Sequence, residues 1–198
     1  MTRLPDPYAT RASGAGVSAE GMGGTRHLGA VRRERWERGA TGERATAALL
    51  EPLALAGWVV LHDRRVPGMA ANIDHLVAST DRLWVLDTKV WRGKIVRLGD
   101  GQLWYADAPV SDRVAVVARI AAAVAMALAR HGDLAGLDVR AACIIQGAHG
   151  DEDRPDVDGV VLLRPADVVA QIVDDHLPVA GTSHLRRRLD SVFAARGD

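Results

Sequence analysis

The chain of 198 residues carries 25 basic and 25 acidic side chains, so its formal net charge is zero, and 48% of its residues are apolar. This length fits one domain with extensions, and the apolar content is sufficient for a core. Balanced charge argues against a protein that depends on nonspecific attraction to DNA, although a local basic patch is compatible with it. The single cysteine, Cys143, excludes an internal disulfide and indicates the reducing cytoplasm.

The first 30 residues are rich in Gly, Ala, Ser and Thr and show no apolar period. They predict a disordered N-terminal arm at 1–30, followed by one domain at 31–198. No apolar segment of a secretory signal is apparent at the start. The longest apolar run, 114–129, is interrupted by Arg119 and is short for a membrane span. We therefore expect a buried helix there and no membrane partner.

A helix is predicted over residues 41–57, after a mixed-charge helical lead-in at 32–38. Thr41 is suited to the N-cap, and Gly57 ends the run. Leucines at 49, 50 and 53 form the apolar face of this helix. Pro52 predicts a kink or a break near its end.

From Trp58 the helical apolar period ends, and short apolar runs separated by turn residues follow. Strands are predicted at 58–66, 73–79, 83–89 and 94–98, with Trp104 beyond the last of them. The polar residues 80–82 form a turn, Gly93 indicates another turn, and Asp100-Gly101 indicates a tight loop. Short strands in succession indicate an antiparallel meander.

The second half of the chain begins with a long Ala/Val-rich helix. Ser111 or Asp112 can cap it, and it should end near Arg130 and Gly132. Buried strands at 139–147 and 159–163, a short helix opened by Pro165 and an amphipathic C-terminal helix at 183–195 follow. This order predicts the α/β class, with a mixed central sheet that contains the meander and is flanked by helices.

Two acids and a lysine carry the candidate chemistry. Pairing through the turn at 80–82 brings Asp74 and Asp87 to the same end of a hairpin, and alternation places Asp87 and Lys89 on one face. Carboxylates of this kind bind Mg²⁺ or Mn²⁺, and such an ion polarises a phosphate and lowers the pKa of an attacking water. Lys89 can orient that water or neutralise developing charge. The alternative is an ion-paired structural cluster.

Lysine usage supports the functional interpretation. Of the 25 basic residues 23 are arginines, and the lysines are Lys89 and Lys94. Because arginine is forked and effectively never deprotonated, a lysine at 89 indicates a need for a compact point charge. Glu43, in the first turn of the predicted helix, is the third candidate acid, and interaction with the helix dipole is an equally good explanation for it.

Several of these residues together resemble the nuclease-related domain (NERD) family, which is grouped with the PD-(D/E)XK nuclease superfamily. The motifs are Gly42-Glu43, the run 73–75 (IDH), the Asp-Thr-Lys step at 87–89, Gly-Lys-Ile at 93–95, and Trp104. The resemblance extends roughly from residue 41 to residue 163. It implies a restriction-endonuclease-like core.

The resemblance also implies roles for individual residues. Asp74 matches the first acid, Asp87 and Lys89 match the (D/E)-x-K step, and Glu43 matches the helix acid. Gln146 matches a polar position after a later strand. The chain departs from the pattern at Asp87, where the family more often has Glu, and at residue 73, where Ile replaces the proline of the superfamily.

Trp91, Arg92, Lys94 and Arg97 lie just beyond the site and form the clearest basic and aromatic cluster. They are candidates to hold a phosphodiester backbone or to stack a base. The alternative is a solvated hairpin in which the tryptophan covers the base.

We therefore expect a cytoplasmic, Mg²⁺- or Mn²⁺-dependent deoxyribonuclease that hydrolyses DNA phosphodiester bonds. One alternative is a catalytically weak or inactive module of the same fold that binds nucleic acid or protein. Another is a homo-oligomer-forming structural domain built around the Ala-rich helix. The acids and the lysine favour the enzyme, whereas the balanced charge and the lack of a separate DNA-binding domain favour the alternatives.

Overall fold

The computed structural model describes residues 21–150, 154–173 and 182–196, and the side chains of 32–147, 154–173 and 182–196. Contacts divide the chain into two units, residues 1–36 and 37–198, and the second unit contains every described strand. The elements in chain order are α1 (Gly21–Leu55), β1 (Val59–Arg65), β2 (Asn72–Ala78), β3 (Arg82–Arg97), β4 (Leu103–Tyr105), β5 (Ala108–Pro109), α2 (Val110–Ala129), β6 (Asp138–Gly150), β7 (Asp156–Val157), β8 (Val160–Leu163), the 3₁₀ helix η1 (Pro165–Asp167), α3 (Val168–Val173) and α4 (Thr182–Val192).

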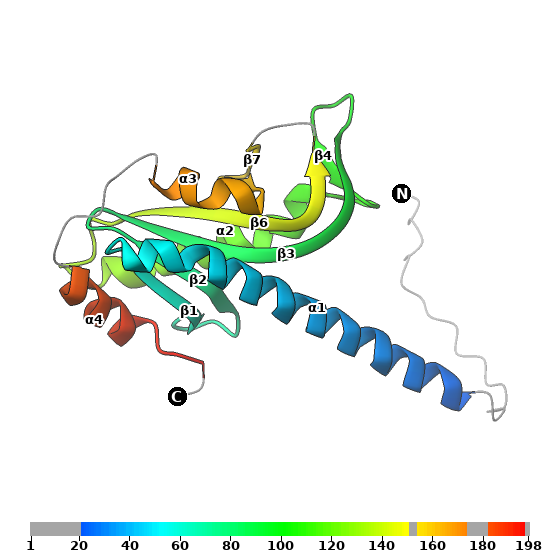
Figure 1. The fold of residues 1–198 in the computed structure, drawn as a ribbon, viewed down its shortest axis with the longest axis horizontal. Helices are drawn as coiled ribbons and strands as arrows, with labels where there is room; N and C mark the ends of the chain where they lie inside the picture. Colours follow the sequence, from blue (N-terminus) through cyan, green and yellow to red (C-terminus); the bar gives the residue numbers. More distant parts are fainter. Residues whose placement is uncertain (1–20, 151–153, 174–181, 197–198) are drawn as a thin grey trace, which may run out of the picture. The chain divides into compact units, whose positions relative to one another are not determined.

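The strands form one mixed eight-stranded sheet in the order β1-β2-β3-β6-β8-β7, with β4 paired to β3 and β5 paired to β4. Strands β1 to β4 pair antiparallel in succession, which confirms the predicted meander. Strand β6 then pairs parallel to β3, and β8 pairs parallel to β6 (Figure 1). The predicted α/β class with a mixed sheet is confirmed, and it is consistent with a nuclease-like core.

Helices cover both faces of the sheet, and β1, β2 and β3 each bury apolar residues on both sides. One face packs α2 and α4 against β1 to β3, around Val85, Val124 and Phe193. The opposite face packs the second half of α1 and α3 against β3 and β6, around Leu50 and Ile172 (Figure 1). Four consecutive residues of β3, from Leu83 to Leu86, are buried, as expected for a strand covered on two sides. Within the residues that the structure describes, no helix has both the length and the apolar character needed to cross a membrane.

The helices differ from the predictions at their starts. α1 begins at Gly21, inside the segment predicted as a disordered arm, whereas residues 1–20 lie outside the described residues. Thr41 is therefore not an N-cap: it lies within α1 and its hydroxyl donates to the carbonyl of Glu37. α2 is preceded by Pro109, and neither Ser111 nor Asp112 caps it. Thr41 thus lies several turns inside α1, whereas Ser111 and Asp112 lie in the first turn of α2.

The turn predicted at Gly93 is also absent, because β3 runs unbroken from Arg82 to Arg97. Gly93 instead lies at a register shift in the pairing of β3 with β6, with φ of 105°. The Tyr105 hydroxyl accepts a hydrogen bond from the N–H of Arg92 (2.7 Å) and donates one to its carbonyl (2.9 Å). The side chain of Tyr105 thus satisfies the backbone that the shift leaves without a ladder partner.

Gly42 marks the closest approach of α1 to the sheet. A Cβ added at Gly42 would lie 2.5 Å from Cγ2 of Val90 and 3.2 Å from Cγ2 of Thr88. We expect Gly42→Ala to lower the free energy of unfolding by about 1–3 kcal/mol, because overpacking forces neighbours to shift. Gly39→Ala, on the same helix with open space around it, should instead stabilise by about 0.5–1 kcal/mol. Urea denaturation of both variants makes the comparison, and equal effects would contradict close packing at Gly42.

Candidate metal and phosphodiester site

The pairing of β2 with β3 places the two candidate aspartates side by side. His75 pairs with Leu86, so the next positions outward along the two strands are Asp74 and Asp87. The Oδ2 of Asp74 accepts a hydrogen bond of 2.8 Å from the N–H of Thr88. The backbone of β3 therefore holds the side chain of Asp74, on β2, in a defined orientation.

Lys89 completes the group on the same face of β3. Its Nζ lies 2.7 Å from Oδ2 of Asp87, and the two side chains are 25% and 15% exposed. Both partners are thus largely removed from water, and a charge buried there without a partner would be costly. The structure brings Asp87 and Lys89 into contact, as the alternation of the strand predicts.

Burial raises the pKa of Asp74 to about 7, and the charge of Asp87 adds to this, whereas the hydrogen bond from Thr88 opposes it. Burial also raises the pKa of Asp87, against the opposing effect of Lys89. Burial lowers the pKa of Lys89, but the carboxylate of Asp87 outweighs this and the pKa lies above its usual value. The site therefore holds two acids that resist ionisation and one permanent cation.

This arrangement has a measurable effect on stability. The pKa of Asp74 is about 7 in the folded protein against an ordinary value of 3.8, so the folded state binds the proton more tightly. In metal-free protein we expect this stabilisation to be present below about pH 4 and to be lost as the pH rises through about 7. As the pH rises, the free energy of unfolding of the wild type should fall by up to about 4 kcal/mol relative to that of Asp74→Asn.

Urea denaturation between pH 4.5 and 8 measures this difference. Asp112→Asn, at an exposed aspartate on α2, serves as a control and should follow the wild type across the range. A difference between wild type and Asp74→Asn that stays constant with pH would mean that the acid is ionised throughout.

Glu43, on α1, acts on the site through its charge. Its side chain is exposed, and its charge is among the causes that raise the pKa of Asp74. Close packing of Gly42 against Val90 and Thr88 explains why this helix comes near the strand. Among the described side chains, however, no three His, Cys, Asp or Glu form a ready ligand group for a metal ion. The two aspartates form the centre of the site, and Glu43 lies at its edge.

A buried polar network that the sequence reasoning missed lies on the opposite face of the hairpin. Nδ1 of His75 lies 2.8 Å from Nδ1 of His62, and its Nε2 lies 3.5 Å from the hydroxyl of Thr88. Burial, reinforced by His62, lowers the pKa of His75 to about 3, so this histidine is neutral. The Thr88 hydroxyl donates to Oγ1 of Thr46 at 2.9 Å, and Nε2 of Gln146 donates to the same oxygen at 3.3 Å.

Thr46 itself carried a signal in the sequence. It lies four residues before Leu50 and seven before Leu53, so a hydroxyl occupies the apolar stripe of the helix. A polar residue at such a position is either satisfied by a buried partner or destabilising.

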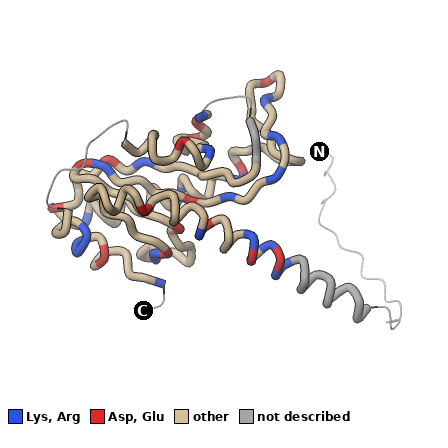
Figure 2. Tube along the Cα trace, viewed as in Figure 1, with Lys and Arg blue, Asp and Glu red and all other residues tan. Residues whose placement is uncertain are grey.

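The basic and aromatic cluster beyond the site is divided by burial. Trp91 is only 8% exposed and stacks on Tyr105, with ring centroids 4.8 Å apart. This matches the alternative in which the tryptophan covers the base of the hairpin, and it leaves that ring without an open face for a base. Arg92 and Lys94 are exposed, and basic residues recur along the outer half of β3 (Figure 2).

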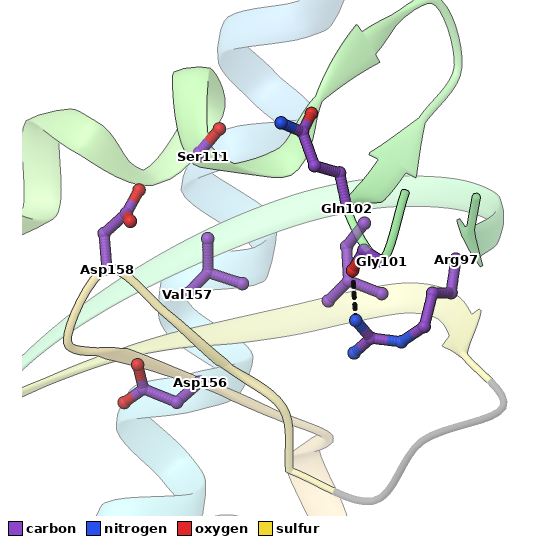
Figure 3. Close-up of a pocket in the computed structure, with 8 residues that line it drawn as sticks. Arg97, Gly101, Gln102, Ser111, Asp156, Val157 and Asp158 are labelled. Atoms are coloured by element: carbon purple, nitrogen blue, oxygen red, sulfur yellow. Dashed lines mark hydrogen bonds between the residues drawn. The ribbon is translucent and has the colours of Figure 1, made fainter. Parts of the chain in front are cut away.

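Arg97 lies further out, in a pocket of about 260 Å³ between the β3–β4 turn, the start of α2 and the β7 region (Figure 3). Its guanidinium donates to the carbonyl of Gly101, and Ser111, Asp156 and Asp158 line the other side. Neither of the site aspartates nor Lys89 lines this pocket. Its acidic groups oppose a phosphate, so it is a poor continuation of a nucleic-acid site.

A comparison with protein families gives one match. The family model described as nuclease-related domain, NERD, matches residues 38–145, which is more than half of the chain. The match begins in α1, ends in β6 and includes Glu43, Asp74, Asp87 and Lys89. Neither the curated proteins nor the solved structures give a match to the chain.

Proposed function

Because the chain belongs to the nuclease-related domain family, we propose that it is a metal-dependent nuclease that hydrolyses DNA phosphodiester bonds. One observation carries the proposal. Two largely buried carboxylates, Asp74 and Asp87, lie on adjacent strands, and the only described lysine near them, Lys89, contacts one of the two. A structural ion pair needs one acid for one base, whereas this site contains a second acid, Asp74, whose pKa is raised to about 7.

The donor set fits Mg²⁺ or Mn²⁺. These ions prefer carboxylate and water oxygens, and one or two carboxylates are enough when substrate phosphate supplies further ligands. Asp74 and Asp87 would hold the ion, with Glu43 contributing from α1. Two adjacent acids with raised pKa values are destabilised when both are ionised, and a divalent cation would relieve that repulsion. Once bound, the ion would lower the pKa of a coordinated water and neutralise charge on the phosphate.

Lys89 acts as a hydrogen-bond donor in this proposal and not as a general base. Its pKa is raised by Asp87, so it keeps its proton at neutral pH. An ammonium can orient the attacking water or stabilise the charge that develops on the phosphate oxygens. Asp87 holds the ammonium at 2.7 Å and so fixes its position relative to the acids.

Arg92 and Lys94 are the side chains that we assign to the DNA backbone. Both are exposed on β3, the strand that carries Asp87 and Lys89, a few residues beyond them. Positive charge at such a place attracts phosphates without reading sequence. Arg97 extends the same strand, although its contact with Gly101 and the nearby aspartates weaken the case for it.

A second function is favoured by the absence of a third ready ligand among the described side chains. In that case the fold serves as a module that binds nucleic acid or protein, with weak or no hydrolysis. The formal net charge of zero is compatible with this alternative.

A cleavage assay separates the two functions. Purified full-length protein is incubated with supercoiled, linear and single-stranded DNA in Mg²⁺, in Mn²⁺ and in EDTA. The nuclease proposal requires cleavage of at least one form that depends on the metal and is lost in Asp87→Asn. DNA binding without cleavage under all of these conditions would favour the binding module.

A further inference from the structure

Three elements meet at one buried oxygen behind the site. Oγ1 of Thr46, on α1, accepts hydrogen bonds from Thr88 of β3 and from Gln146 of β6. Thr46 is fully buried and Thr88 is 9% exposed. Because a buried hydroxyl without partners is costly, these bonds have one favourable arrangement, and a helix that slid along the strands would break them.

Thr46 lies one helical turn after Gly42, and Gly42 packs on the same Thr88 side chain. The glycine sets how closely α1 approaches β3, since any Cβ there would meet Val90 at 2.5 Å. Close approach alone does not set the position of the helix along the strand, because apolar contact is not directional. The hydrogen bonds of Thr46 are directional and supply that restraint.

Glu43 lies between these two anchors in the sequence. Its side chain is exposed, and its charge contributes to the raised pKa of Asp74. The hydroxyl of Thr88 donates a hydrogen bond to Thr46, and its N–H donates one to Asp74. The same threonine therefore links the helix that carries one acid to the acid on the neighbouring strand.

We propose that Thr46 is a positioning residue for the divalent-cation site, and that its hydroxyl sets the place of Glu43 relative to Asp74 by fixing α1 on β3. The inference rests on the proposed function, because it assumes that these acids share an ion. It assigns no contact between Thr46 and the ion itself.

The test is the Kd of Mn²⁺ for the full-length protein, measured by isothermal titration calorimetry. Thr46→Val keeps the branched shape and removes the hydroxyl, whereas Thr46→Ser keeps the hydroxyl. Removal of a group that orients metal ligands typically weakens metal affinity by about 10–100-fold. We expect Thr46→Val to weaken Mn²⁺ binding at least about tenfold and Thr46→Ser to restore most of the loss. Thr41→Val, the same change at an exposed threonine of the same helix, should bind as the wild type does.

A double-mutant comparison identifies the route of the effect. If Thr46 acts through Glu43, adding Thr46→Val to Glu43→Gln should weaken binding no further than Glu43→Gln alone. Thr88→Val removes the same hydrogen bond from the strand side and keeps the N–H to Asp74, so it should reproduce the effect even if Thr46→Val folds poorly.

Each remaining outcome has a definite meaning. Wild-type affinity in both Thr46→Val and Thr88→Val, with binding lost in Asp87→Asn, would overturn the inference and leave the proposed function standing. Losses that multiply in the double variant would show that Thr46 does not act through Glu43, and would overturn it as well. No Mn²⁺ binding by the wild type would overturn the proposed function and this inference together.

Discussion

Lys89→Arg should retain DNA binding and lose about 99% of the cleavage rate, because a misplacement of about 1 Å can cost roughly 10²-fold in rate. The substitution keeps the positive charge, so the electrostatic attraction to the phosphate backbone should survive. The guanidinium is longer, planar and forked, however, and it cannot take the place of an ammonium that lies 2.7 Å from Asp87 in a largely buried site. Single-turnover cleavage beside equilibrium DNA binding, for wild type and variant, measures the two properties separately.

The second lysine of the chain provides the comparison. Lys94 is exposed on the same strand, where only its charge is expected to matter, so Lys94→Arg should reduce cleavage far less than Lys89→Arg. Lys89→Ala should lose both the rate and part of the affinity. Full activity in Lys89→Arg and in Lys89→Ala would remove this lysine from the mechanism.

Asp87→Asn should abolish the stabilisation of the protein by divalent cations. A ligand that binds only the folded state at about 100 times its Kd contributes about 2.7 kcal/mol, which for a chain of this size corresponds to a rise in Tm of roughly 5–10 °C. The wild type should show this rise with Mn²⁺. The variant should show almost none, because an amide is a weaker, uncharged ligand and Lys89 loses its anionic partner.

Differential scanning calorimetry with Mn²⁺ and with EDTA makes the measurement. Asp112→Asn, on the exposed face of α2, should keep the full rise. An unchanged rise in Tm in Asp87→Asn would mean that the ion binds elsewhere on the protein. It would also contradict the roles proposed for Asp74 and Glu43.

The corrections to the predicted elements concern residues of one kind. Thr41, Ser111 and Gly93 are residues that commonly end or interrupt elements, and each lies inside one in the structure. Local preferences of this kind amount to about 1 kcal/mol. At Ser111 the burial of Val110 and Val114 in the first turn of α2 outweighs them. Near Gly93 the hydroxyl of Tyr105 forms hydrogen bonds with the backbone of Arg92 beside the register shift. Tyr105 lies on another strand, so the residues next to Gly93 do not predict this contact.

The hairpin of β2 and β3 and the shared face of Asp87 and Lys89 could be predicted from the residues alone. The polar turn at 80–82 joins two apolar runs, and the two-residue spacing of Asp87 and Lys89 places both on one face of a strand; both features are local. Asp87 and Lys89 therefore had to share a face, and Asp74 had to lie near them.

Only the tertiary structure decided what surrounds these residues. The parallel pairing of β3 with β6 and the bonds of Thr46 to Thr88 and Gln146 join segments that are far apart in the chain. Such contacts depend on which elements pack together, and no short-range period encodes that choice. Burial also raises the pKa values of both aspartates, and burial is a property of the packed sheet and helices rather than of the residues themselves.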